Sequence, residues 1–294
     1  MNKIVTIFGG CGFLGIYMIK ELVSRGYSVR VYDRTIKAFE ESVEYIEGDI
    51  LDQEKVDRAI QGSNIVYNLA AISDIDECVQ RPIEAMKYNV IGNGIIMQSC
   101  LDHKVDRYVF SSSVYAYNDI GGIYSSTKKA SESFIKDFAK YYGLKYTILQ
   151  YGTIYGVGAP KENSMHNYLK SALIDKKIQY LGDGSEIREY IHVSDASRLG
   201  IDVLDQEYEN KTLIITGHNP TNVKDLFRMI QEIIGGDIDI EYNFSPQIGK
   251  KKSHYKITPY FFNQNMPRKL TSNQYVDLGV GILEMLEHLK QSKK

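Results

Sequence analysis

IVTIFGGCGFLG, residues 4–15, is the stretch of this 294-residue chain that decides the predicted fold. The short apolar run at 4–8 favours a buried strand, and the glycines that follow it favour a tight turn. Apolar residues then recur with helical spacing at Ile16, Ile19 and Leu22, so a helix is expected directly after the turn. A strand, a glycine-rich turn and a helix in this order are typical of the first unit of a parallel α/β sheet that binds a dinucleotide.

The glycines of this turn have separate expected roles. Gly9 allows the tight turn, Gly12 lets backbone N–H groups approach a pyrophosphate, and Gly15 permits close packing between helix and strand. Phe13 and Leu14 lie between these glycines, so we expect both to line the dinucleotide site. A glycine-rich turn alone is weak evidence, because glycine is common in turns after strands.

The end of the second predicted strand, residues 28–32, supplies the stronger signal. Asp33 follows it directly, and a carboxylate at this point can accept hydrogen bonds from both ribose hydroxyls and would repel a 2′-phosphate. NAD is therefore favoured over NADP. Arg34 is also expected at the coenzyme, and it keeps NADP open as the alternative because a guanidinium can bind the phosphate. Farther along, Asp49 and Ile50 follow a short predicted strand and are expected near the adenine.

Further apolar runs bounded by turn residues recur along the chain, with helical stretches between them. Beyond residues 4–8, the expected strands cover 28–32, 65–70, 107–111, 145–150 and 212–216. This alternation predicts an α/β fold, a Rossmann-type doubly wound parallel sheet with a smaller mixed α/β substrate lobe. Glycines and prolines become frequent after Tyr155, where we place the boundary. The expected coenzyme domain covers 1–154 plus about 189–216, and the expected substrate lobe covers 155–188 and 217–294.

Composition and charge exclude several classes of protein. The chain has 35 Lys and Arg against 37 Asp and Glu, so it has no net positive field for nucleic acid. The apolar run at 4–8 is too short for a signal sequence or a membrane span. The 3 cysteines are far apart and the 6 histidines lack metal-ligand spacing, so we expect a cytoplasmic protein without a metal. The basic run at 249–254 is expected to be a solvated loop, with a phosphate contact as the alternative.

A tyrosine and a lysine four residues apart form the candidate catalytic pair. Tyr124 and Lys128 would lie on one face of a helix, where the ammonium can stabilise phenolate and lower the pKa of the tyrosine. The chain contains a second such pair, Tyr141 and Lys145. Gly143 lies inside that second pair and is expected to end the helix, so its two side chains should diverge.

A serine just after the predicted strand 107–111 completes the candidate catalytic set. Ser113 can hydrogen-bond the substrate hydroxyl that is oxidised. Its two successors, Val114 and Tyr115, cannot exchange a proton near pH 7.

The order of these motifs resembles the extended short-chain dehydrogenases/reductases, a family rich in nucleotide-sugar epimerases and dehydratases. The resemblance covers nearly the whole chain and also includes the segments at 68–71, 89–92, 111–113, 151–156 and 182–195. It implies NAD as the coenzyme, a nucleotide-diphosphate sugar as the substrate, and a homodimer.

The resemblance also implies roles for individual residues. Coenzyme contacts are expected at Leu69, Ala70, Ala71, Asn89, Ser111, Tyr124, Lys128 and Tyr151. The catalytic residues implied are Ser113, with Ser112 as the fallback, together with Tyr124 and Lys128. Substrate contacts are expected at Ser113, Thr153 and Arg188, the arginine binding the diphosphate.

Departures from the family pattern concern the carbohydrate pocket. Asn68 stands where many relatives have His, Gln150 where many have Arg, and Thr153 where an Asn often touches the substrate. The 4,6-dehydratases of the family carry an Asp-Glu pair directly after the catalytic Ser or Thr, and this chain has Val114 and Tyr115 there.

These residues favour an epimerase that acts at carbon 4 through a transient 4-keto sugar. A 4-dehydrogenase or 4-ketoreductase with exchangeable NAD(P) needs the same residues and stays open. A non-catalytic NAD-binding sensor is the alternative from another class, since a fold alone does not determine function.

Overall fold

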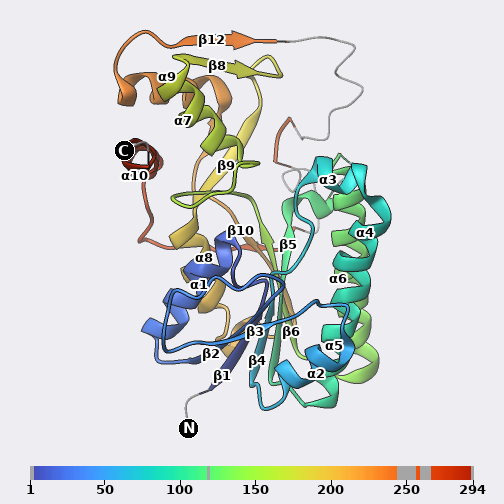
Figure 1. Cartoon of the computed structure of the whole chain (residues 1–294). Helices are drawn as coiled ribbons and strands as arrows, with labels where there is room; N and C mark the ends of the chain where they lie inside the picture. The colour runs from blue at the N-terminus through green and yellow to red at the C-terminus, as the bar shows by residue number, and fades with distance from the viewer. Residues whose placement is uncertain (1–2, 118–119, 244–255, 259–265, 293–294) are drawn as a thin grey trace.

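The computed structural model describes residues 3–117, 120–243, 256–258 and 266–292 (Figure 1). Within them, an eight-stranded sheet forms the centre of the molecule, and all its neighbouring strands pair in parallel. Its spatial order is β13 (Arg268–Lys269), β10 (Lys211–Ile215), β6 (Tyr146–Tyr151), β5 (Arg107–Ser113), β4 (Ile65–Asn68), β1 (Ile4–Phe8), β2 (Ser28–Asp33) and β3 (Glu44–Glu47). The strand order turns back between β1 and β4, as in doubly wound sheets, which confirms the predicted fold class.

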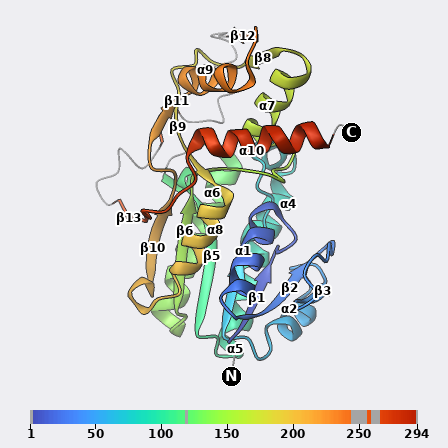
Figure 2. The same ribbon diagram turned by 90° about the vertical axis from the view of Figure 1, so that its left-hand side faces the viewer.

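Helices cover both faces of this sheet (Figures 1 and 2). One face carries α1 (Phe13–Ser24) and α8 (Val193–Asp202), which pack against each other. The other carries α2 (Gln53–Ile60), α5 (Asn93–Asp102) and α6 (Gly122–Tyr142). Shorter elements connect them: α3 (Ile75–Gln80), α4 (Pro82–Met86), a π-helix η1 (Lys87–Gly92), and the 3₁₀ turns η2 (Val114–Tyr117) and η3 (Gln206–Tyr208).

Alternation of side chains along the buried strands builds two separate cores. Val5 and Ile7 of β1 pack with α1 and α8, whereas Phe8 packs on the opposite side with α2 and α5. Residues that are apolar on both faces are expected of a parallel strand covered by helices on each side. The predicted strands are all found, with ends that differ by one or two residues; β5 runs on to Ser113.

A smaller mixed layer sits above the carboxyl edge of the large sheet, at the top of Figure 1. It contains a three-stranded sheet, β11 (Pro220–Asn222), β9 (Ile187–His192) and β7 (Thr153–Tyr155), and a two-stranded sheet, β12 (Asp239–Tyr242) and β8 (Lys177–Tyr180). Its helices are α7 (Ser164–Ile174), α9 (Val223–Ile234) and α10 (Leu278–Gln291). They share one buried core, which includes Leu169, Phe227 and Ile282.

The chain crosses between the two layers more often than the predicted domain boundaries suggest. Strand β13 belongs to the substrate lobe in the predicted division, yet it pairs with β10 at the edge of the large sheet. The division into 1–154 plus 189–216 and the remainder stays a prediction.

The described residues contain neither a candidate membrane span nor a candidate metal centre. None of the helices in these ranges combines the length and apolarity needed to cross a bilayer. No group of three or more His, Cys, Asp or Glu in the described ranges is arranged to hold a metal ion. The basic run at 249–254 lies outside the described residues.

Candidate active site

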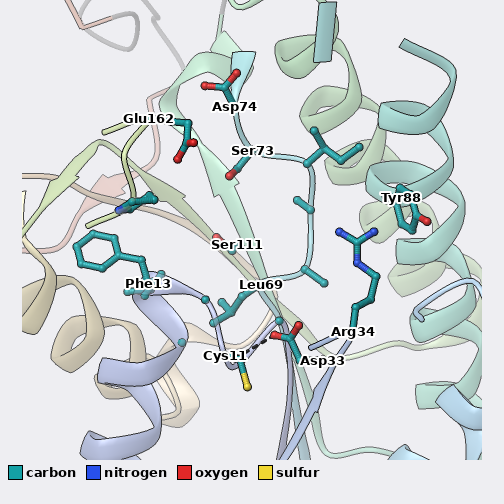
Figure 3. A pocket seen from close by; sticks show the side chains of 18 of the residues that line it. Cys11, Phe13, Asp33, Arg34, Leu69, Ser73, Asp74, Tyr88, Ser111 and Glu162 are labelled. Carbon is teal, nitrogen blue, oxygen red and sulfur yellow. Dashed lines mark hydrogen bonds between the residues drawn. The ribbon is translucent and has the colours of Figure 1, made fainter. Parts of the chain in front are cut away.

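A cavity of about 910 Å³ opens at the carboxyl ends of β1, β2, β4 and β5, below the smaller layer. Most of the residues predicted to bind the coenzyme line it, and Figure 3 shows them converging from several elements. They are Gly9, Gly12, Phe13, Leu14, Gly15, Asp33, Arg34, Ile50, Leu69, Ala70, Ala71, Ser111, Tyr124 and Tyr151. The carboxyl edge at the reversal of strand order is where open α/β sheets bind ligands.

The glycine turn leaves room where a side chain would clash. Gly9 has φ +77°, and a Cβ there would lie 2.7 Å from the backbone N of Ala70. A Cβ on Gly15 would lie 2.5 Å from the carbonyl O of Gly10. Helix α1 starts after Gly12 without a side-chain cap, so its first N–H groups have no side-chain acceptor. An uncapped helix N-terminus beside a cavity fits a pyrophosphate.

Asp33 and Arg34 point to different parts of the cavity. The Asp33 Oδ2 accepts a hydrogen bond of 3.0 Å from the backbone N of Cys11, which holds its carboxylate beside the glycine turn (Figure 3). The Arg34 guanidinium lies 4.8 Å from the ring centroid of Tyr88. Asp33 thus lies beside the glycine turn, and Arg34 extends toward Tyr88.

Asp49 is occupied by contacts within the protein. Its Oδ1 accepts from the backbone N of Leu51 at 2.9 Å, and its Oδ2 accepts from the Tyr88 hydroxyl at 3.1 Å. Asp49 does not line the cavity, whereas its neighbour Ile50 does.

Ser113, Tyr124 and Lys128 come together at the end of β5. Tyr124 is hydrogen-bonded to Ser113. The Lys128 ammonium donates to the carbonyl O of Ser111 at 2.7 Å and lies 5.7 Å from the centroid of the Tyr124 ring. Lys128 is buried and does not line the cavity, so it contacts the site only from the interior of the protein.

Burial changes the acid–base properties of this pair. It raises the pKa of Tyr124 to about 12, although the hydrogen bond with Ser113 works against this rise. It also lowers the pKa of Lys128 to about 8, while the charge of Glu132 raises it. Desolvation is thus the largest influence on this phenol in the protein alone, and the lowering of its pKa by Lys128 stays a prediction.

The second Tyr-x-x-x-Lys pair diverges as predicted. Helix α6 ends at Tyr142, and Gly143 adopts φ +77°, the left-handed cap. Tyr141 is exposed, and Lys145, beyond the cap, lies 3.6 Å from the carboxylate of Glu209.

The serine chosen from the sequence contacts the tyrosine. Ser112, the fallback, donates to Glu132 at 2.5 Å, whereas Ser113 is the one hydrogen-bonded to Tyr124. Both serines line the cavity.

Several predicted site residues lie elsewhere. The Asn89 side chain contacts the backbone N and O of Ile72 at 2.8 and 3.0 Å and Thr127 at 3.1 Å, so it fixes a loop wall of the cavity. Thr153, at the start of β7, and Arg188, on β9, are both half-buried and do not line this cavity. Their substrate contacts stay predictions.

Some cavity residues were missed by the sequence analysis. Ser73 and Asp74 follow the predicted 68–71 segment, and Glu162 and Asn163 come from the loop before α7 (Figure 3). The position of Ser73 shortly after the end of a predicted strand could have identified it as a cavity residue. Glu162 reaches the cavity only through the packing of the smaller layer, so nothing local in the sequence marks it.

Comparisons with known proteins agree with this geometry. Residues 5–215 match the NAD dependent epimerase/dehydratase family. The chain is 29% identical over 285 residues to a UDP-glucose 4-epimerase of Lactobacillus helveticus, covering 83% of this chain and 85% of that protein. It is 26% identical over 261 residues to a UDP-N-acetyl-alpha-D-glucosaminuronate decarboxylase of Bacillus cytotoxicus, covering 79% and 81%.

A solved structure shares the fold over almost its entire length. The UDP-glucuronic acid 4-epimerase from Bacillus cereus, in complex with UDP-glucuronic acid and NAD, superposes with a TM-score of 0.84 at 20% identity. The match covers 98% of this chain and 99% of that one.

Proposed function

Because the chain belongs to the NAD dependent epimerase/dehydratase family, we propose that it is a nucleotide-sugar 4-epimerase that works through a transient 4-keto sugar. One observation carries the proposal. Ser113, Tyr124 and Lys128 meet at the edge of the coenzyme cavity, and the two residues after Ser113 offer no further acid–base pair.

The cavity fits NAD through this chain's own groups. The turn at Gly9–Gly15 and the N-terminus of α1 would hold the pyrophosphate, and Asp33 would accept from the adenosine ribose. When bound, the coenzyme supplies a nicotinamide that takes up a hydride and returns it.

Tyr124 is the group that would move the proton. It would accept the proton of the sugar 4-hydroxyl as the phenolate, while Ser113 holds the reacting oxygen. Lys128 would supply the positive charge that favours the phenolate, held in place by the carbonyl of Ser111. Return of the proton from Tyr124 to the 4-oxygen, after the sugar has turned over, completes an inversion.

The surroundings of Ser113 argue against elimination chemistry. Val114 is buried in an apolar cluster with Ile214, and the ring of Tyr115 lies edge-on to the ring of Tyr124 with centroids 6.3 Å apart. Neither side chain can serve as the carboxylate that a 4,6-dehydratase places there.

The proposal extends to organisation and location. We propose that residues 155–188 and 217–294 bind the sugar nucleotide, Arg188 among them, with Thr153 of the coenzyme domain as a further contact. We further propose that the protein acts in the cytoplasm, where its 3 free cysteines stay reduced. We also propose a homodimer. Exposed apolar residues lie on α6 and on the helices α3, α4 and η1 that pack against it: Val79, Ile83, Met86, Ile91 and Phe134.

A panel of nucleotide-sugars tests the proposed function. UDP-, dTDP-, GDP- and CDP-hexoses are incubated with the enzyme and NAD, and the products are identified by NMR. At least one should be converted to its C4 epimer. Tyr124→Phe should lower this turnover by about 100- to 10,000-fold, the usual cost of a lost general base, with NAD binding and folding kept. Undiminished activity in that variant would remove Tyr124 from the reaction.

A further inference from the structure

A buried carboxylate lies one helical turn beyond the catalytic lysine. Glu132 is 7% exposed and follows Lys128 on α6 at the spacing that separates Lys128 from Tyr124. Residues four apart lie on one face of a helix, so all three side chains face β5. Burying a carboxylate is costly unless hydrogen bonds and charges compensate, so its position requires an explanation.

These three side chains contact three consecutive serines at the end of β5. Tyr124 is hydrogen-bonded to Ser113, and Lys128 donates to the carbonyl O of Ser111 at 2.7 Å. Glu132 completes the set, because the Ser112 hydroxyl donates to its Oε1 at 2.5 Å. The same face of α6 therefore fixes each residue of the strand end that carries the reacting serine.

Strand β6 and the turn η2, which follows β5, also take part in this network. Gln150 of β6 donates to the Glu132 Oε1 at 2.9 Å, and the Tyr117 hydroxyl of η2 donates to the Gln150 Oε1 at 2.6 Å. The carboxylate is thereby held from β5 and β6, and through Gln150 from η2. An ordinary surface acid on α6 would have none of these contacts.

Few cations face Glu132. Lys128 is buried beside it, and Lys136 of the same helix lies 3.8 Å from its Oε2 but is half exposed. The charge of Glu132 also raises the pKa of Tyr117 in η2 and the pKa of Tyr146 in β6. From α3, the thiol of Cys78 faces Lys128.

We propose that Glu132 is a positioning residue for the reaction: it fixes the strand end that carries Ser113 through Ser112, and it places a carboxylate one helical turn from Lys128. The proposal rests on the proposed function in so far as Tyr124 acts as the base. The two parts of the role have separate readouts. Loss of the charge should change how Lys128 titrates, and loss of the Ser112 bridge should change turnover alone.

Glu132→Gln tests the charge, because the amide keeps the size and an acceptor oxygen. Asp137→Asn, an exposed acid on the same helix, is the matched control. Carbon-13 NMR of lysine Cε gives the pKa of Lys128 directly, with its signal assigned from Lys128→Met. Burial lowers this pKa to about 8 and Glu132 raises it, so the pKa should fall further in Glu132→Gln, by about one unit. It should stay unchanged in Asp137→Asn.

Turnover should follow the same titration. The alkaline limb of kcat/KM should move to lower pH in Glu132→Gln, so its activity relative to the wild type falls about sevenfold more at pH 8.5 than at pH 6. An unchanged Lys128 pKa, or a loss of activity that is equal at every pH, would overturn the charge role.

Ser112→Ala removes the hydrogen bond between Ser112 and Glu132, and it tests the positioning role even if Glu132→Gln does not fold. It should lower kcat by about tenfold or more while leaving the pKa of Lys128 and the affinity for NAD as in the wild type. Wild-type kcat in this variant would overturn the positioning role. If no nucleotide-sugar is epimerised but the Lys128 pKa shifts as expected, the proposed function fails and the electrostatic role of Glu132 stands.

Discussion

Asp33 and Arg34 are adjacent in the chain, but their side chains contact different parts of the protein. The carboxylate of Asp33 is tied to the glycine turn through the backbone N of Cys11, and the guanidinium of Arg34 stacks on Tyr88. A 2′-phosphate at the Asp33 carboxylate would meet a like charge, whereas Arg34 lines the same cavity with its guanidinium beside the Tyr88 ring. The sequence alone left the choice between these two residues open, because adjacent side chains can face either way after a strand end.

We predict that the protein binds NADH at least about tenfold more tightly than NADPH, since juxtaposed like charges are unfavourable. Isothermal titration with each coenzyme measures this ratio. Equal or tighter binding of NADPH would contradict the role given to Asp33. Loss of that NADPH binding in Arg34→Ala would then assign selectivity to the arginine.

Arg188 carries the prediction about the substrate nucleotide. Arg188→Ala should weaken binding of the nucleotide-sugar by about 1.5–3 kcal/mol, the range for a lost charge-assisted hydrogen bond, and leave NAD affinity nearly unchanged. Thermal shift with the substrate, and calorimetry with NAD, separate the two effects. Unchanged substrate affinity would exclude this arginine from the diphosphate site.

Single residues also show where prediction from sequence ends. Tyr124 and Lys128 were identified because helical spacing is readable, and Gly143 excluded the competing pair. The raised pKa of Tyr124 was not foreseen, because desolvation depends on the packing of α3, α6 and β5 around the ring. Glu162 carried no local signal, and Glu132 was not identified although it lies four residues beyond Lys128, since its serine and glutamine partners are brought to it by tertiary contacts.

Elements were predictable in proportion to their length and periodicity. Six strands of the large sheet, β1, β2, β4, β5, β6 and β10, are largely apolar runs covered on both faces, and the ends of each were expected within two residues. The shortest strands, such as β13 with its 2 residues at the edge of the large sheet, have no period to detect. The π-helix η1 was also missed. It lies where Asn89 reaches the loop after β4, a setting typical of π-turns near functional sites.

The junction between β1 and α1 gives the prediction at this scale. Gly15→Ala should destabilise the protein by about 1–3 kcal/mol and weaken NAD binding, because the new Cβ would lie 2.5 Å from the carbonyl O of Gly10. Gly94→Ala is the matched control. It lies in helix α5 with no atom within 4 Å of the added Cβ, so it should stabilise by about 0.5–1 kcal/mol. Urea unfolding measures both, and equal midpoints for the two variants would contradict this packing.

At the scale of the whole molecule, apolar side chains on the helices that pack against α6 are exposed to solvent in the single chain. Ile83 is 59% exposed and Ile91 58% exposed, on adjoining elements that pack on α6. We predict that the wild type sediments as a dimer and that Ile83→Lys with Ile91→Lys gives a monomer. Leu181→Lys, at an equally exposed apolar residue in the smaller layer, should leave the dimer intact. A monomeric wild type would remove the homodimer from the account.

We propose that the smaller layer holds the sugar and presents it to a coenzyme bound on the larger layer. An epimerase must return the hydride to the same sugar carbon, whereas a 4-dehydrogenase or 4-ketoreductase exchanges it with free coenzyme. The most direct test uses the C4-deuterated form of the nucleotide-sugar that the panel identifies, followed by NMR of the product and absorbance at 340 nm. We predict that the epimerised sugar keeps its deuterium at carbon 4 and that NADH shows no net change. Deuterium lost from carbon 4 to the coenzyme, with NADH formed or consumed in step with the sugar, would contradict it.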